Sequence, residues 1–280
     1  MQRMGIPRPL FSIQDRMARA LRRHYRAMVR SMVRDIKQAA VMAGVTLDHA
    51  LVCDAGEFLS EAWKNLAGEN NQLINRANAA ALENTLENQW QEPGTVAEDV
   101  QKEIEKAIKR EQDDYLKRLF ADADGKTRLR LDTFAIDKEK LFESNMDALR
   151  TMYIDNSLER IKGEEELIKR KILKRITDYA LGKSDKLSLT DLTGMANEQG
   201  ATLARLFARD QMQRFNKAVT LSTFRMAGVT KVKWVTSHDR RVRETHRALD
   251  GHVFGIEELP EEVDDYNCRC GLVPVEWADD

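Results

Sequence analysis

WVTSHDRRVRETHRALDGHVF at residues 234–254 opens the stretch that decides the fold of this chain's end, and NCRCGLVPVEW at residues 267–277 closes it. The stretch holds three of the five histidines and two of the three cysteines. Lys231–Val235 before it alternates as a half-buried strand does, Asp250-Gly251 marks a tight turn, and Val253-Phe254 is a short strand. We therefore expect a small α+β module here, and specific chemistry within it.

Four polar residues in this stretch follow helical spacing, which predicts a short helix from about Asp239 to Leu249. They are Asp239, Arg243, His246 and Asp250. The neighbouring stripe, expected to face the core, consists of Val242, Thr245 and Leu249. The polar stripe fits three functions: a structural polar network, a metal site that uses His246, or a catalytic pocket in which His246 acts as an acid or a base.

The turn Asn267–Gly271 carries two thiols, Cys268 and Cys270, separated by one residue. A disulfide across one residue is strained, whereas both sulfurs can reach one metal ion. With His246 and Asp239, or with His238 or His252 in place of Asp239, they would form the four ligands of a tetrahedral zinc site. This spacing matches no familiar zinc finger, and two alternatives stay open. These are paired buried thiols in a small core, and nucleophilic or redox chemistry.

The rest of the 280-residue chain has the character of charged amphipathic helix, since the composition is 32% charged and only 6% aromatic. We predict a mainly α protein with an extended helical N-terminal part and a small α+β C-terminal domain. The expected divisions are residues 1–125, 126–197 and 198–280. Within the middle and last divisions we expect helices at about 134–153, 158–181 and 198–227, with a short helix after Ser188 whose start resembles a capping box with Asp191.

A helix expected from Ser12 to about Ala43 carries a continuous basic stripe. The stripe consists of Arg16, Arg19, Arg23, Arg26, Arg30, Arg34 and Lys37. The stripe fits two interpretations. It could be a solvated helix face, or a face that contacts phosphates or an acidic protein surface. The stripe itself contains no aromatic residue for base stacking, so any nucleic-acid contact would be to the backbone.

Charge is also distributed unevenly along the chain. Residues 1–40 carry ten Lys or Arg against Asp15 and Asp35, whereas residues 255–280 carry nine Asp or Glu against Arg269. Such asymmetry favours charged partners or head-to-tail contacts. No apolar run approaches the roughly 20 residues that span a bilayer, and no signal-peptide core is evident. We expect a protein made and used in a cytoplasm, or in something assembled there.

Two other features have ordinary structural interpretations. Gly182-Lys183-Ser184 is not a nucleotide-binding loop, because such a loop requires a glycine where Thr177 stands. Gly182 is better interpreted as the C-cap of a helix. Cys53 is isolated in a helical pattern, and we expect it to be a small buried apolar residue. The first ten residues, with Pro7 and Pro9, are expected to form an extended arm.

In their order, these motifs resemble the C-terminal domain of the phage Mu F-like head morphogenesis proteins, which are minor capsid proteins of tailed phages. The resemblance covers residues 198–280. The matched positions are Ala208-Arg209-Asp210-Gln211, Asn216, Trp234, Asp239, Arg241-Val242-Arg243, His246, Asp250-Gly251 and Asn267-Cys268-Arg269-Cys270. The acidic loop Glu257–Asp265 is not part of that pattern, so the pattern gives no reason to expect an open pocket there.

The resemblance implies a minor head protein that acts in head morphogenesis by binding the portal or the procapsid, with packaged DNA as a further contact. It implies a place in the virion or procapsid interior, and in the host cytoplasm during assembly. Implied partners are the portal protein and other head or scaffold proteins, with oligomers compatible and no membrane. No enzymatic role follows from it. The alternative is a metal-dependent hydrolase or nuclease built on the His246, Cys268 and Cys270 cluster, with Asp239 and Asp250 as carboxylates.

Overall fold

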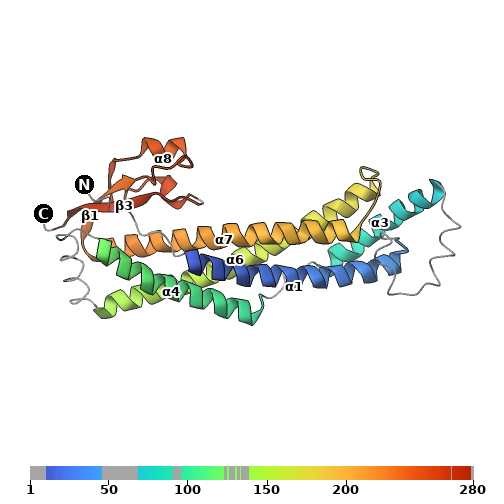
Figure 1. The fold of residues 1–280 in the computed structure, drawn as a ribbon, viewed down its shortest axis with the longest axis horizontal. Helices are drawn as coiled ribbons and strands as arrows, with labels where there is room; N and C mark the ends of the chain where they lie inside the picture. The colour runs from blue at the N-terminus through green and yellow to red at the C-terminus, as the bar shows by residue number, and fades with distance from the viewer. Residues whose placement is uncertain are drawn as a thin grey trace. The chain divides into compact units, whose positions relative to one another are not determined.

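A computed structural model describes residues 11–45, 69–90, 96–122, 125, 130, 133, 139–265 and 267–278. The described part is mainly helical, with a small antiparallel sheet near the C-terminus (Figure 1). The predicted fold class, mainly α with a small α+β C-terminal part, is thereby confirmed. The interpretations of Cys53 and of the first ten residues fall outside the described residues.

Long helices make up most of the described chain. They are α1 Phe11–Ala43, α3 Glu69–Gln89, α4 Glu98–Asp122, α6 Glu139–Ala180 and α7 Leu189–Met226. The sequence analysis was wrong about two breaks, because α6 runs through residues 154–157 and α7 runs through residue 198. In α6 the polar run is accommodated inside the helix, where the Ser157 hydroxyl donates to the Tyr153 carbonyl at 2.6 Å.

Both ends of the connection between α6 and α7 follow the sequence signals. Gly182 has φ +72°, and its N–H and that of Lys183 donate to the carbonyls of Tyr179 and Asp178 at 2.9 and 2.8 Å. This is the hydrogen-bonding pattern of a glycine-terminated helix, so the C-cap interpretation is confirmed. The Ser188 hydroxyl accepts the Asp191 N–H at 3.2 Å and caps α7.

The residues fall into two compact units, each assembled from separate segments of the chain. Unit 1 comprises Met1–Ala20, Glu98–Leu158 and Arg205–Asp280. Unit 2 comprises Leu21–Ala97 and Glu159–Ala204. The division at residues 125 and 197 stays a prediction.

Unit 2 has a close helix contact between α1 and α7. A Cβ placed on Gly200 would lie 2.8 Å from the Cβ of Tyr25, and Tyr25 is only 1% exposed. The Tyr25 hydroxyl donates to Glu164 at 2.6 Å, and burial together with the Glu164 charge raises the pKa of Tyr25. Tyr25 is therefore fixed at both its stem and its tip, and Gly200 is required by packing.

We expect Gly200→Ala to destabilise the protein by about 1–3 kcal/mol, because the fixed Tyr25 cannot move away from the added methyl group. Gly194→Ala is the matched control on the same helix, since nothing lies within 4 Å of a Cβ placed there. That control should be neutral or stabilising by up to about 1 kcal/mol. Urea unfolding of both variants measures the difference, and equal stability would contradict the packing argument.

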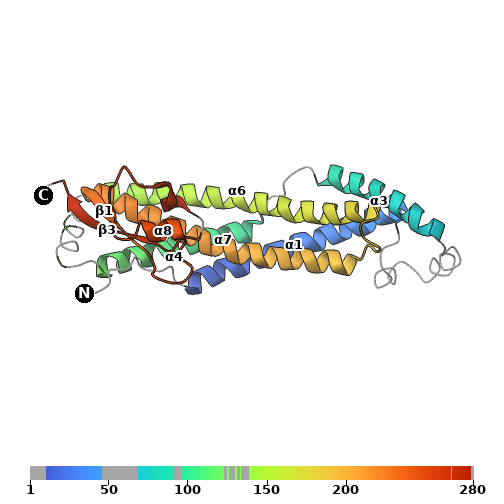
Figure 2. The same cartoon turned by 90° about the horizontal axis from the view of Figure 1, so that it is seen from above.

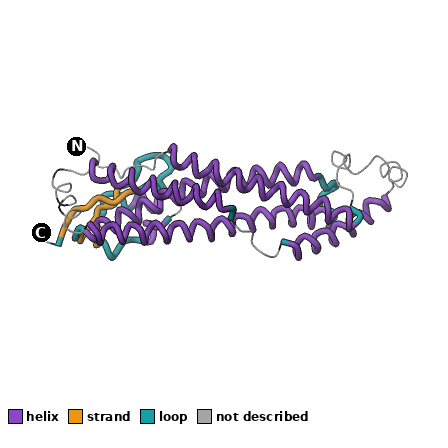
Figure 3. Tube along the Cα trace, turned by 90° about the horizontal axis from the view of Figure 1, so that it is seen from below, coloured by secondary structure: helices purple, strands orange, loops and turns teal. Residues whose placement is uncertain are grey.

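The residues of the sheet all belong to unit 1. Figure 2 labels β1 and β3, and Figure 3 draws the strands in orange. Its strands are β1 Val229–Val235, β2 Val253–Gly255 and β3 Gly271–Trp277, in the antiparallel order β2-β1-β3. The two expected strands are found as β1 and β2. Strand β3 was not recognised from the sequence, and its Pro274 is tolerated because β3 is an edge strand. We call residues 229–278, with the short helix α8 Glu244–Ala248, the sheet module.

Candidate metal centre

Helix α8 places His246 inside the sheet module. The expected helix from Asp239 to Leu249 is wrong in its first half, because α8 spans only Glu244–Ala248. Before it, the Asp239 carboxylate accepts the Arg241 N–H at 2.8 Å and shapes a local turn instead. The expected core-facing stripe is also wrong. Thr245 is exposed and His246 is the buried residue of α8, with its ring edge-on to Trp234 at a centroid distance of 5.5 Å.

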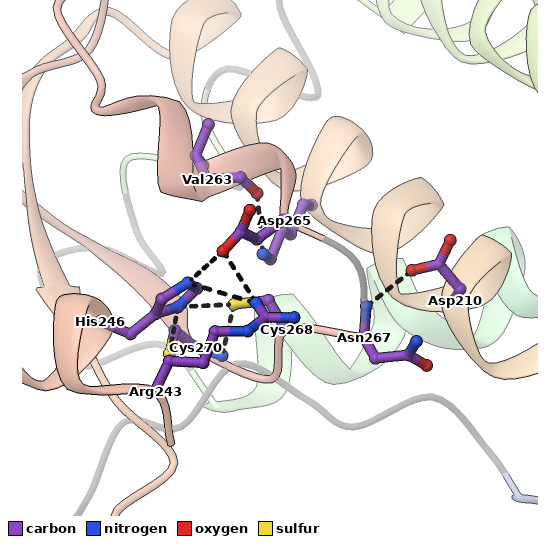
Figure 4. A network of polar contacts seen from close by, with 9 residues as sticks. Asp210, Arg243, His246, Val263, Asp265, Asn267, Cys268 and Cys270 are labelled. Carbon is purple, nitrogen blue, oxygen red and sulfur yellow. Dashed lines mark hydrogen bonds and ion pairs between the residues drawn. The ribbon is translucent and has the colours of Figure 1, made fainter. Parts of the chain in front are cut away.

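The imidazole of His246 meets both thiols of the NCRC turn, residues 267–270 (Figure 4). Its Nδ1 lies 3.3 Å from Cys268 Sγ and 3.4 Å from Cys270 Sγ. The three ligand atoms all lie within 4.8 Å of one another, and the three residues are only 2–6% exposed. Neither thiol is in a disulfide. This Cys₂His cluster, His246 with Cys268 and Cys270, is a donor set that could hold one metal ion.

The second ring nitrogen of His246 faces a carboxylate. Asp265 Oδ2 lies 2.7 Å from His246 Nε2 and 2.8 Å from the guanidinium of Arg243 (Figure 4). The hydrogen bond with His246, followed by the charge of Arg243, holds the pKa of Asp265 below its ordinary value. Asp265 is therefore an ionised acceptor that faces the ring from the side away from the thiols.

The two thiols titrate as a pair with opposite shifts. Sharing a hydrogen bond with Cys270, together with the charge of Lys217, lowers the pKa of Cys268 to about 5. The same contact and burial raise the pKa of Cys270. In addition, the Cys270 N–H donates to Cys268 Sγ at 3.4 Å. Of the two thiols, Cys268 is thus the one that ionises more easily, and a bound cation would favour the ionised form of both.

Helix α7 fixes the NCRC turn through Asn267, which has φ +54°. Asn267 accepts from Arg209 Nε at 2.8 Å, and its own N–H donates to Asp210 at 2.7 Å. Asp210 is fully buried. Further along α7, Lys217 Nζ donates to the Val263 carbonyl at 2.8 Å. Charge-assisted bonds of this kind position the acidic loop and the turn beside the cluster.

Asp239, the fourth ligand expected from the sequence, does not join the cluster within the described residues. Its carboxylate pairs with Arg269 and accepts the Ser237 hydroxyl at 3.1 Å. Of the substitutes, His238 lies 3.6 Å from Asp250, and His252 is exposed with its ring against Phe254.

Asp265 is the site residue that sequence reasoning missed. Helical spacing from His246 cannot identify it, because it lies at the end of the loop that follows β2. A carboxylate three residues before Cys268 was the only local signal. The Asp250 carboxylate, for its part, accepts the Thr236 N–H at 2.7 Å, so Asp239 and Asp250 serve turns rather than a shared cation site.

The remaining candidate surface, the basic stripe of α1, lies on the side opposite to buried residues such as Met17, Leu21 and Ile36. All seven stripe side chains are exposed except Lys37, which is half-buried. The structure therefore presents this face to solvent, and its use as a binding surface stays a prediction.

Comparison with known families places most of these features in one segment. Residues 154–273 match the model of the family described as Phage Mu protein F like protein. This segment is similar to the Mu F-like family. The resemblance drawn from the sequence is thereby confirmed. The Mu F-like segment includes most of α6, all of α7, the Cys₂His cluster and the Asn267 contacts that hold the turn.

Two relatives of the chain are described as uncharacterized proteins. One, from Haemophilus influenzae, is 37% identical over 92 residues, which cover 30% of this chain and 21% of that protein. The other, from Methanocaldococcus jannaschii, is 37% identical over 87 residues, which cover 30% of this chain and 14% of that protein. The matches thus span less than a quarter of either relative. No solved structure matches the chain.

Proposed function

We propose that this protein is a minor head protein of a tailed bacteriophage and acts in head morphogenesis. The observation that carries the proposal is the Mu F-like match over residues 154–273. The contacts of this segment agree with a structural role, because Arg209, Asp210 and Asn267 join the turn to α7. Its place of action would be the virion or procapsid interior, after assembly in the host cytoplasm.

The proposed partner is the portal protein or another head protein with an acidic surface, and the proposed contact is the basic stripe of α1. Seven cations on one helix face, six of them exposed, form a continuous positive stripe along α1. The same surface would accept DNA phosphates as a second partner. None of the described helices is long and apolar enough to cross a membrane.

We also propose zinc as the ion of the Cys₂His cluster. Among the common divalent ions, zinc is the one that favours thiolate and imidazole ligands together. Support comes from the convergence of three buried ligand atoms on one point. This ion would link α8 to the NCRC turn. Such a link would stabilise the sheet module, which suits a structural protein that has to stay folded during assembly.

The partner proposal predicts that reversing charge on the stripe blocks incorporation into heads. In a host that carries the parent phage with this gene deleted, Arg23→Glu/Arg30→Glu supplied in trans should be incorporated about tenfold less than wild type, because like charges across an interface repel. Immunoblots of purified heads measure incorporation.

The matched control is Lys109→Glu/Lys117→Glu, which reverses two exposed charges on α4. This variant should be incorporated normally. Equal incorporation of both double variants would reject the stripe as the contact surface. DNase treatment of the heads distinguishes the two partners, since retention through DNA alone would be lost with the DNA.

A further inference from the structure

We infer that Asp265 is the positioning residue of the cluster: it holds His246 in the tautomer that offers Nδ1 to the metal, so that the ion is bound by Nδ1 and both thiolates. A fourth coordination position is then left to water or to a ligand from outside the described residues. This inference rests on the proposed zinc site and gives its coordination. It also replaces Asp239, the ligand expected from the sequence, with a carboxylate that does not touch the ion.

The tautomer follows from what each partner can do. An ionised carboxylate only accepts hydrogen bonds, and Asp265 Oδ2 lies 2.7 Å from His246 Nε2. The ring proton of neutral His246 therefore belongs on Nε2. Nδ1 is left with a free lone pair, and it is Nδ1 that lies 3.3 and 3.4 Å from the two sulfurs. A carboxylate, a histidine and a metal in this order fix the tautomer and the orientation of the ring.

The spacing of the ligand atoms is already close to that of a zinc site. With Zn–S of about 2.3 Å and Zn–N of about 2.0 Å, tetrahedral angles place nitrogen and sulfur roughly 3.5 Å apart. The observed separations, 3.3 and 3.4 Å, are within a few tenths of an ångström of that value. Only a small outward shift of the thiols is needed to admit the ion.

Three protein ligands are what the described residues supply. No fourth His, Cys, Asp or Glu among them joins the cluster. Asp265 cannot serve, because it contacts Nε2, on the far side of the ring from the sulfurs (Figure 4). Arg243, 2.8 Å from Asp265 and 3.5 Å from His246 Nε2, keeps that carboxylate in place. Three-ligand zinc sites keep their fourth position for water or an added ligand.

The test is the zinc affinity of the full chain, measured by competition with a chromophoric chelator. Asp265→Ala should bind zinc about 10–100-fold more weakly than wild type, the usual effect of losing such a partner. Asp265→Asn should lose less, because its amide oxygen still accepts the Nε2 proton. Asp264→Asn, at the exposed neighbouring position, and Asp239→Asn should both bind as wild type does.

A second measurement does not depend on stability. In ¹⁵N-labelled zinc-loaded protein, the His246 ring should show a protonated Nε2 and a metal-bound Nδ1, and Co²⁺-loaded Asp265→Asn should keep the thiolate charge-transfer bands of the wild type. Should Asp265→Ala fail to fold, Asp265→Asn and the ring shifts still decide the question.

The possible failures are distinguishable. Wild-type protein that binds no zinc would overturn the zinc proposal and the role of Asp265 with it. Wild-type affinity in Asp265→Ala, or a metal-bound Nε2, would overturn the positioning role and leave the zinc site standing. A loss in Asp239→Asn equal to that in Asp265→Ala would restore Asp239 as a ligand.

Discussion

Replacing Cys268 and Cys270 together by serine is expected to remove all tightly bound zinc and to unfold the sheet module at a lower temperature. The two sulfurs are two of the three proposed ligand atoms, and a serine hydroxyl does not ionise at neutral pH. A ligand present at 1,000 times its Kd stabilises the folded state by about 4 kcal/mol. Loss of the ion should therefore lower stability by an amount of that order.

Elemental analysis of protein purified without a histidine tag gives the metal content, and calorimetry with and without chelator gives the stability. Cys53→Ser, which removes the third cysteine, should keep its zinc and is the control for losing a thiol elsewhere. The chelator arm separates the two interpretations of the thiols. If the serine variant melts lower than wild type by the same amount in chelator as without it, the thiols stabilise only as buried groups and the zinc proposal fails.

Most of the helical part of the fold could be predicted from the sequence, because the spacing of apolar residues and the helix caps are local signals. Helical spacing identified α1, and Gly182 marked the end of α6. The break expected at residues 154–157 was an error of the same local kind. Polar residues there favour a turn, but Ser157 returns its hydrogen bond to the preceding turn of the helix, and the long helix continues.

The cluster could be predicted only in part. From the clustering of histidine and cysteine in one stretch, the sequence analysis expected His246 near the thiols, and the structure places it there. The sheet module is small, so its few buried side chains lie close together. The contact between Asp265 and His246 depends on the path of the loop after β2, which local spacing does not encode. Asp239 lies outside the cluster among the described residues, because the Arg241 N–H and the Arg269 side chain occupy its carboxylate.

The Mu F-like pattern spreads over many residues because its members meet only in the folded state. Arg209 and Asp210 lie on α7, and their partner Asn267 follows 58 and 57 residues later in the chain. Asn216 lies further along α7 and donates to a different partner. Its amide donates instead to Glu111 of α4 at 2.8 Å. The pattern therefore also records how α7 packs against α4 within unit 1.

Glu111→Ala should destabilise the protein by about 3 kcal/mol, the second-largest effect we expect. Glu111 is fully buried, and the same carboxylate oxygen accepts from Asn216 and, at 3.0 Å, from Arg118. Removing one partner of a buried charge network leaves the others desolvated and unsatisfied, which costs more than the contact itself contributed. Because the buried amide oxygen of Asn216 has no hydrogen-bond partner among the described residues, its side chain would then lose its one described hydrogen bond.

Urea unfolding of Glu111→Ala, Asn216→Ala and three further variants tests this argument. Glu111→Gln keeps the shape and an acceptor oxygen but no charge, so it should fall between wild type and alanine. Glu98→Ala, which breaks an exposed pair with Lys102 on the same helix, should cost no more than about 0.5 kcal/mol. The double variant Glu111→Ala/Asn216→Ala should be less destabilised than the sum of the two single variants, because each single change already breaks the shared bond. Strict additivity would mean that the Glu111–Asn216 bond does not couple α4 to α7, and the packing role assigned to Asn216 would be wrong.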